Sequence, residues 1–421
     1  MVSESEQSVA LQNERLQPMM PQVEHNALVG AEQLASEVVE ILEGLFLARQ
    51  GALALHEPEF SERAEARVVE CIRSTFVSSV GAFVSEFEAR LAEHCGVAHA
   101  VAVVNGTAAL EVALRVAGVE SNTEVLLPSL TFVATPNAVS HLNAVPHFVD
   151  INEQTLGIDP AALCQHLNQV GESKAGRLCN RKTGRPISAI VPVHVFGHPV
   201  AMDELVEVAD AFGIAVVEDA AEALGSQYRG RHCAAMGLLG AISFNGNKII
   251  TTGGGGAVLT NDADLADTAR HLSTTAKRAH PWAFEHDRVG YNYRMPNINA
   301  ALGVSQLEEL PDRIAKKRQL AIAYIDGFAE HPDLRIMREP EHSVSNYWLN
   351  TLLLEPHAAF ARDVILQSLN DAGFMARPVW EPMHTLSMYA DAPRALLPNT
   401  ESIAERIINL PSSAKLAELL Q

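Results

Sequence analysis

The stretch Ala100-Val101-Ala102-Val103-Val104-Asn105-Gly106-Thr107 decides the fold of this chain. Five small apolar residues in a row are typical of a strand that is buried on both faces. Asn105-Gly106 then predicts a turn, and Thr107 begins a helical stretch that runs through Ala117. A strand, a short turn and a helix in this order form the first unit of a sheet that is covered by helices.

The same alternation of apolar runs and helical stretches continues along the chain. It predicts strands at 124–127, 145–149, 187–193, 214–218, 241–244 and 257–260, and helices at 135–142, 202–212 and 264–272. This pattern implies an α/β fold with a mostly parallel sheet and helices on both faces. Ligands of such sheets bind at the carboxyl ends of the strands, so we expect the functional residues there.

The composition of the chain changes along its length and predicts four parts. Residues 1–30 are polar and acidic and predict a flexible tail. Residues 31–54 are predicted to hold an N-terminal helix, because apolar residues recur near a 3.6-residue period at Leu34, Val38, Ile41, Leu45 and Leu47. A large domain is expected at 55–310. A smaller C-terminal α+β domain is expected at 311–421, with a helical pattern that breaks between Leu307 and Arg313.

The charge of the chain limits its partners. The 421 residues carry a formal net charge of -20, with 48% hydrophobic and 19% charged residues. A protein that neutralises a nucleic-acid backbone needs a basic face, so nucleic acid is not expected as a partner. An anionic substrate has to be held by a local group of basic side chains and helix N-termini.

The cysteines and the apolar runs predict a cytoplasmic protein. Five cysteines are scattered without a Cys-x-x-Cys motif, which favours reduced thiols: Cys71, Cys95, Cys164, Cys179 and Cys233. The first residues lack the basic and apolar pattern of a signal peptide. No apolar run reaches the roughly 18 residues needed to span a bilayer, so no membrane partner is expected.

Lys248 and Asp219 are the residues with the clearest chemical meaning. Lys248 ends the run Ser243-Phe244-Asn245-Gly246-Asn247-Lys248. It lies 29 residues after Asp219, which ends the run Val216-Val217-Glu218-Asp219. Pyridoxal phosphate chemistry needs a lysine to form a Schiff base and a carboxylate to keep the ring nitrogen protonated. Taken singly, Lys248 could be a surface lysine before a glycine-rich turn, and Asp219 could be a helix N-cap.

Gly106-Thr107 lies between a predicted strand and a predicted helix. Backbone N–H groups at a helix N-terminus, together with a threonine hydroxyl, form a phosphate site. The alternative is an ordinary N-cap. Asp219, Ser243 and Lys248 belong to the same predicted sheet, and this favours phosphate binding.

Phe132 and His194 each follow a predicted strand. Phe132 could stack on a planar ring, although a core phenylalanine is the commoner case. His194 and His198 have a spacing that suggests a metal pair on a helix, but Gly197 and Pro199 argue against a helix here. We therefore expect no metal site and assign His194 to the cofactor pocket.

An aromatic and basic cluster follows the predicted sheet, and it has two interpretations. It could line an anionic sugar-nucleotide pocket, or it could be a solvated loop between domains. Its members are Trp282, Arg288, Tyr291, Asn292, Tyr293 and Arg294.

From about Leu55 to Ser413 the chain resembles the pyridoxal-phosphate-dependent nucleotide-sugar aminotransferases of the DegT/DnrJ class. The runs that carry the resemblance are Val104–Leu110, Pro128–Phe132, Glu218–Glu222, Ser243–Lys248 and Gly290–Met295. A narrower likeness to the LegC-like branch, associated with legionaminic-acid and similar bacterial surface sugars, rests on Leu55–Pro58, Val77–Gly81, Phe244–Lys248 and Asn409–Ser413.

The resemblance implies a fold-type-I transferase with pyridoxal 5'-phosphate, and a homodimer with active sites at the interface. Lys248 matches the Schiff-base lysine, Asp219 the acid at the ring nitrogen, and Phe132 the stacking position. Gly106, Thr107 and Ser243 match phosphate ligands, and Asn292 resembles the ligand donated by the partner subunit. Glu222 stands where much of the family has glutamine or histidine near the ring hydroxyl. Weaker assignments to the substrate pocket are Arg288, Arg294, Arg377 and His384.

The implied reaction is transfer of an amino group from L-glutamate to the keto carbon, C4, of a nucleotide-linked deoxy sugar in surface-polysaccharide or nonulosonic-acid biosynthesis. Two alternatives remain. One is a sugar dehydratase of the same fold, which has histidine in place of the lysine, so Lys248 argues against it. The other is a non-catalytic regulatory protein that binds the cofactor.

Overall fold

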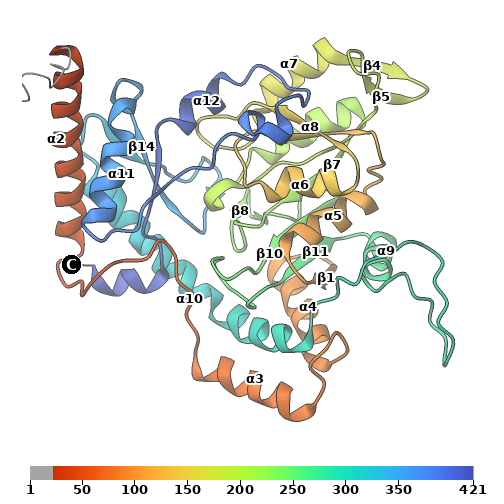
Figure 1. Ribbon diagram of the computed structural model, residues 1–421. Coiled ribbons are helices and arrows are strands. Elements are labelled where there is room, and N and C mark those ends of the chain that lie inside the picture. The colour runs from red at the N-terminus through yellow and green to blue at the C-terminus, as the bar shows by residue number, and fades with distance from the viewer. Residues whose placement is uncertain (1–21, 421) are drawn as a thin grey trace, which may run out of the picture.

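A seven-stranded sheet forms the centre of the larger part of the molecule (Figure 1). The computed structural model describes residues 22–420. The strands are β1 (His99–Val103), β2 (Glu124–Pro128), β3 (Val145–Val149), β6 (Ile187–Ile190), β7 (Ala215–Asp219), β10 (Leu239–Ser243) and β11 (Gly256–Thr260). Their order is β1-β11-β10-β7-β6-β2-β3, and β11 runs antiparallel to both of its neighbours, while the other pairs are parallel. The predicted α/β fold with a mostly parallel sheet is confirmed.

Helices cover both faces of this sheet. One face carries α5 (Gly106–Val116), α6 (Ala134–His141) and α9 (Ala263–Ser273), and the other carries α4 (Ala82–Cys95), α7 (Pro160–Val170) and α8 (Met202–Phe212). Strand β1 shows why two cores form, because successive side chains of a strand point to opposite faces. Val101 and Val103 pack in the core that contains α5, and Ala100 and Ala102 pack in the core that contains α4.

A second, four-stranded sheet lies in the C-terminal part of the chain. It consists of β12 (Leu334–Ile336), β14 (Asn350–Leu354), β16 (Ile407–Leu410) and β15 (Arg377–Pro378), in that order and antiparallel throughout. Helices α11 (Arg362–Asp371) and α2 (Gln22–Leu45) pack beside it, as Figure 1 shows. The predicted α+β character of this part is confirmed.

Further elements lie outside the two larger sheets and the helices that pack on them. They are α3 (Glu62–Ser74), α12 (Pro398–Ala404), the hairpin of β4 (Gly171–Lys174) and β5 (Arg177–Asn180), and the small sheet of β13 (Ser343–Val344), β8 (Gln227–Tyr228) and β9 (Arg231–His232). Among residues 22–420, no helix combines the length and the apolar composition needed to cross a membrane.

Helix α2 begins earlier than the sequence predicted. The predicted tail at 1–30 is wrong for residues 22–30, which are helical, while residues 1–21 lie outside the described residues. Nothing between Pro21 and Gly30 breaks a helix, so the helix extends back to Gln22. Its buried stripe is Ala31, Ala35, Val38 and Leu42, continued by Phe46 just past its end, whereas Leu47 is exposed.

Helix α10 (Asn297–Gly327) runs through Pro311 without the break that the sequence predicted. A proline inside a helix removes one hydrogen bond and costs about 3 kcal/mol. Here the helix is buried on both sides of the proline: Val304 belongs to a core of the large sheet, and Tyr324 belongs to the core of the small sheet. The predicted boundary at 310 falls inside this helix, and the division into domains stays a prediction.

Candidate active site

A cavity of about 330 Å³ lies where β7 and β10 end and α5 begins. This is the edge of the sheet at which parallel strands expose their carboxyl ends. The residues predicted from the sequence that line it are Gly106, Thr107, Phe132, Asp219, Glu222, Ser243 and Lys248. The sheet therefore brings together seven residues that are spread over more than a hundred positions of the chain.

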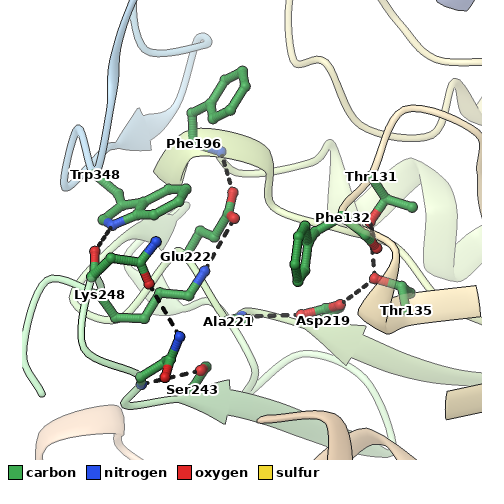
Figure 2. A network of polar contacts seen from close by, with 12 residues as sticks. Thr131, Phe132, Thr135, Phe196, Asp219, Ala221, Glu222, Ser243, Lys248 and Trp348 are labelled. Atoms are coloured by element: carbon green, nitrogen blue, oxygen red, sulfur yellow. Dashed lines mark hydrogen bonds and ion pairs between the residues drawn. The ribbon is translucent and has the colours of Figure 1, made fainter. Parts of the chain in front are cut away.

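Lys248 points into the cavity from the loop that follows β10 (Figure 2). Its Nζ lies 3.1 Å from Glu222 Oε1 and 4.1 Å from the centre of the Trp348 ring. The indole Nε1 of Trp348 donates a hydrogen bond of 2.8 Å to the carbonyl of Asn247, which fixes the ring beside the lysine. Because the lysine side chain is only 12% exposed, its amine faces the cavity and not bulk water.

Asp219 ends β7 on another side of the cavity, with Phe132 between it and Glu222 in Figure 2. It is 4% exposed, and its carboxylate accepts hydrogen bonds from Thr135 Oγ1 (2.8 Å) and from the Ala221 amide (3.1 Å). Burial raises the pKa of Asp219, and these two hydrogen bonds offset the rise only in part. Within residues 22–420 no basic side chain pairs with it. A cation in the cavity would supply the missing partner.

The N-terminus of α5 provides the anion-binding end of the cavity. Asn105 caps the helix by accepting a hydrogen bond of 2.8 Å from the Ala108 amide. A Cβ atom at Gly106 would lie 2.7 Å from Cβ of Ser243, so glycine lets the helix start abut the end of β10. Backbone N–H groups of a first helical turn, with the hydroxyls of Thr107 and Ser243 beside them, suit a phosphate.

Aromatic side chains form one wall of the cavity. Phe132 is 50% exposed, although it lies next to buried residues of the sheet, so its ring is open to the cavity. The Trp380 ring lies 6.0 Å from Phe132 and 5.3 Å from Phe196, measured between ring centres. A planar ring bound in the cavity would lie against Phe132.

The arrangement fits pyridoxal phosphate on three separate counts. The buried Asp219 carboxylate lacks a cation, which a protonated ring nitrogen would supply. The start of α5 offers unpaired amides to a phosphate, and the Lys248 amine lies at the cavity wall for an aldehyde.

His194 does not line the cavity, in contrast to its predicted place in the cofactor pocket. Its Nε2 lies 3.0 Å from Glu218 Oε2, and its Nδ1 accepts a hydrogen bond of 3.1 Å from the Val200 amide. The neighbouring Val193 faces the cavity instead. The sequence places His194 at a strand end but does not say which way its ring turns.

Arg294 and His384 are occupied by contacts within the protein. Arg294 Nη1 pairs with Glu88 at 2.7 Å and donates to the carbonyl of Ala102 at 2.9 Å. His384 Nδ1 lies 2.8 Å from Ser129 Oγ, and burial lowers the pKa of His384. Neither side chain lines the cavity.

Arg288, Asn292 and Arg377 are exposed and also lie outside the cavity wall. Arg377 Nη1 donates to Asn370 Oδ1 at 3.1 Å. Arg288 and Asn292 belong to the loop after α9 that extends away from the sheet in Figure 1. Their assignments to substrate, and to the partner's site, stay predictions.

Three residues of the site were not found from the sequence. Thr135 bonds to Asp219, and Trp348 and Trp380 line the cavity from the C-terminal part of the chain. Both tryptophans lie about a hundred residues or more beyond Lys248, and no local pattern links them to it. Only their scarcity, three tryptophans in the chain, could have drawn attention to them.

The fold and the cavity define this chain as a fold-type-I aminotransferase that uses pyridoxal phosphate. The sequence model of the DegT/DnrJ/EryC1/StrS aminotransferase family matches residues 58–419, and the chain belongs to that family. The family resemblance found in the sequence is confirmed.

Curated relatives and solved structures cover most of the chain. The putative pyridoxal phosphate-dependent aminotransferase EpsN of Bacillus subtilis (strain 168) is 37% identical, over 86% of this chain and 92% of the relative. GDP-perosamine synthase of Escherichia coli O157:H7 is 36% identical, over 87% of this chain and 94% of the relative. A crystal structure of DesI in the presence of its TDP-sugar product is 31% identical, with a TM-score of 0.76 over 90% of this chain and 95% of that chain.

Proposed function

We propose that this aminotransferase moves the amino group of L-glutamate to the C4 keto carbon of a nucleotide-linked deoxy sugar. The product would enter surface-polysaccharide or nonulosonic-acid biosynthesis in the cytoplasm. The observation that carries the proposal is the shared cavity of Lys248 and Asp219 at the start of α5.

The relatives support a nucleotide sugar as the substrate. The names of two of them contain a GDP-linked and a TDP-linked sugar, so the nucleotide itself is a question for the assay. The narrower likeness to the LegC-like branch stays a prediction.

Lys248 and Asp219 would divide the chemistry between them. Pyridoxal phosphate, when bound, supplies an electron sink that stabilises negative charge at the reacting carbon. The Asp219 carboxylate would hold a proton on the ring nitrogen and keep the ring electron-poor. The Lys248 amine would anchor the cofactor and, when free, move the proton at the reacting carbon. The start of α5 and Ser243 would hold the phosphate.

A homodimer would complete the site. The loop after α9 exposes Trp282 (81%) and Phe284 (81%), and large exposed apolar side chains on one loop favour a protein contact. In this dimer Asn292 would reach the cofactor phosphate of the partner subunit. Arg288, Arg377 and His384 are the side chains to test for sugar or diphosphate binding. Light scattering should give the mass of two chains.

A panel of UDP-, GDP- and dTDP-linked 4-keto sugars, assayed with L-glutamate, tests the proposal. One member should gain an amino group while 2-oxoglutarate forms in equal amount, as measured by mass spectrometry. A dehydrated sugar with no amine would favour the dehydratase alternative. Cofactor binding without turnover of any member would favour the regulatory alternative.

A further inference from the structure

Glu222 is a second carboxylate in the cavity, and the protein holds it beside Lys248. Its Oε1 lies 3.1 Å from Lys248 Nζ, and its Oε2 accepts a hydrogen bond of 2.9 Å from the Phe196 amide. The backbone carbonyl of Glu222 accepts a further bond of 2.9 Å from Asn346 Nδ2. With 6% exposure, the carboxylate is fixed in place and shielded from water.

The amide that holds Glu222 comes from a strained residue. Phe196 has φ 55° and ψ 14°, the left-handed region that side chains other than glycine rarely adopt. Such a residue persists only where its surroundings maintain it. In Figure 2 the Phe196 amide, Glu222 and the Lys248 amine follow one another in a line. The strained residue therefore supplies the amide that orients the Glu222 carboxylate toward the Lys248 amine.

The lysine needs an acceptor for a proton. An ammonium group has no lone pair and cannot attack an aldehyde, so Lys248 has to become a neutral amine first. Nζ lies 4.1 Å from the centre of the Trp348 ring, whose face attracts a cation. Two carboxylates from the described part of the chain line the cavity, Asp219 and Glu222, and Glu222 is the one in hydrogen-bond contact with Nζ.

We propose that Glu222 is the proton partner of Lys248. Its carboxylate takes a proton from the ammonium when the lysine binds the cofactor, which leaves Nζ as a neutral amine. The N–H bond at Nζ breaks, the O–H bond at Oε1 forms, and the electron pair stays on nitrogen. The proposal rests on the proposed function, because it assumes that Lys248 bonds to pyridoxal phosphate.

The surroundings of the pair agree with this role. Burial raises the pKa of Glu222 by more than the nearby Lys248 lowers it, and the like charge of Asp219 adds to the rise. His56 lies across the Trp348 ring, at 6.4 Å between ring centres, and burial together with Lys317 and Lys248 lowers the pKa of His56 well below its usual value. The lowered pKa favours a neutral His56, which adds no positive charge beside Lys248 and Glu222.

The pair makes a specific prediction about pH. Ammonium with carboxylate, and amine with carboxylic acid, contain the same number of protons. Their ratio does not change with pH as long as one proton is shared between them. For a lysine without this partner, the fraction in the neutral amine form rises about tenfold with each pH unit, as long as the pH is below the pKa of the lysine.

The experiment measures how fast the full-length protein, freed of cofactor, captures pyridoxal phosphate between pH 6 and 8. Visible absorbance follows the capture, and borohydride reduction with mass spectrometry locates the cofactor on Lys248. The wild-type rate should vary by less than about twofold across this range. Glu222→Gln should capture more slowly at pH 6 and accelerate about tenfold per pH unit. Glu222→Asp should restore a flat profile at a lower rate, and Glu204→Gln, an exposed carboxylate on α8, should match the wild type.

Equal slopes for the wild type and Glu222→Gln would overturn the inference. A wild-type rate that rises tenfold per pH unit would also overturn it, even if Glu222→Gln does not fold. Capture on a residue other than Lys248 would overturn the proposed function as well. Amination of a 4-keto sugar by a wild type with a sloping profile would leave the proposed function standing and remove only the role of Glu222.

Discussion

Glu218 and Asp219 are neighbours at the end of β7, yet they belong to two different regions of the molecule. Successive strand residues point to opposite sides, so Glu218 faces the protein interior and Asp219 faces the cavity. Glu218 accepts hydrogen bonds from His194 and from the amides of Ala234, Met236 and Gly237, at 2.6–3.0 Å. Burial opposes its ionisation, but these donors lower the pKa of Glu218 below its usual value.

Asp219 is as deeply buried but accepts only two hydrogen bonds, and its pKa is raised. The difference separates a carboxylate that stabilises the fold from one that awaits a ligand. A charge whose partners are all protein groups contributes to stability, and a charge that lacks a partner marks a binding site. Substitution of Glu218 should therefore change the stability of the protein, and substitution of Asp219 should change its activity.

Lys248→Ala should give the largest effect on activity. Among residues 22–420, Lys248 is the only lysine that lines the cavity, so turnover of the 4-keto sugar by the variant should fall by about a thousandfold or more. Its melting temperature without cofactor should stay near that of the wild type. Lys316→Ala, at a half-buried lysine that pairs with Glu418, is the matched control. Normal turnover by Lys248→Ala would remove the lysine from the mechanism.

Asp219→Asn and Glu218→Gln test the two sides of β7 directly. Asp219→Asn should lower kcat by about a hundredfold, because the ring nitrogen loses its anionic partner. It should not destabilise the cofactor-free protein at pH 7. A pKa that is raised on folding means that ionised Asp219 costs stability above its unfolded pKa, and asparagine removes that cost.

Glu218→Gln should show the opposite pattern. Glutamine offers the surrounding buried donors one oxygen acceptor in place of two, and an unsatisfied buried donor costs about 1–3 kcal/mol, so the melting temperature should fall while the folded protein still binds cofactor. The lowered pKa of Glu218 places its stabilising effect above the unfolded pKa of about 4, and this effect disappears as pH falls through the folded pKa. The difference in free energy of unfolding between Glu218→Gln and the wild type should therefore become smaller at acidic pH. Similar melting temperatures of Glu218→Gln and Asp219→Asn would show that the two carboxylates do not differ in their contribution to stability.

Trp348→Phe should have a smaller effect on activity. Phenylalanine keeps a ring near Lys248 but has no N–H for the carbonyl of Asn247. The loss of about 1 kcal/mol in positioning corresponds to about a fivefold fall in kcat. Trp348→Leu removes the ring as well and should lie further below the wild type. Equal activity of both variants with the wild type would show that the ring does not act on the lysine.

The sequence predicts the fold well where local patterns are strong. β3 and α8 have the predicted bounds, because each stands between clear breaks in the sequence. It fails at Pro311, where burial on both sides of the proline outweighs its local preference against a helix.

The sequence predicts the candidate site only in part, for a different reason. Lys248, Asp219 and Gly106 lie at strand ends, and parallel strands bring such residues together. Trp348 enters the cavity from the segment just before β14 of the second sheet, and Arg294 turns away to Glu88, more than two hundred residues distant. Both facts depend on packing between distant segments, which no local pattern encodes.

His194→Ala should have the smallest effect on activity. The sequence assigned His194 to the cofactor, but its ring lies between Glu218 and the Val200 amide. Removing it leaves the buried Glu218 short of one donor, which costs about 1–3 kcal/mol, and the three backbone amides remain. The melting temperature should fall, while the Kd for pyridoxal phosphate and the kcat of the folded protein change less than about twofold. Calorimetry and cofactor titration measure the two effects separately. A large loss of cofactor affinity with unchanged stability would instead support the predicted place of His194 in the cofactor pocket.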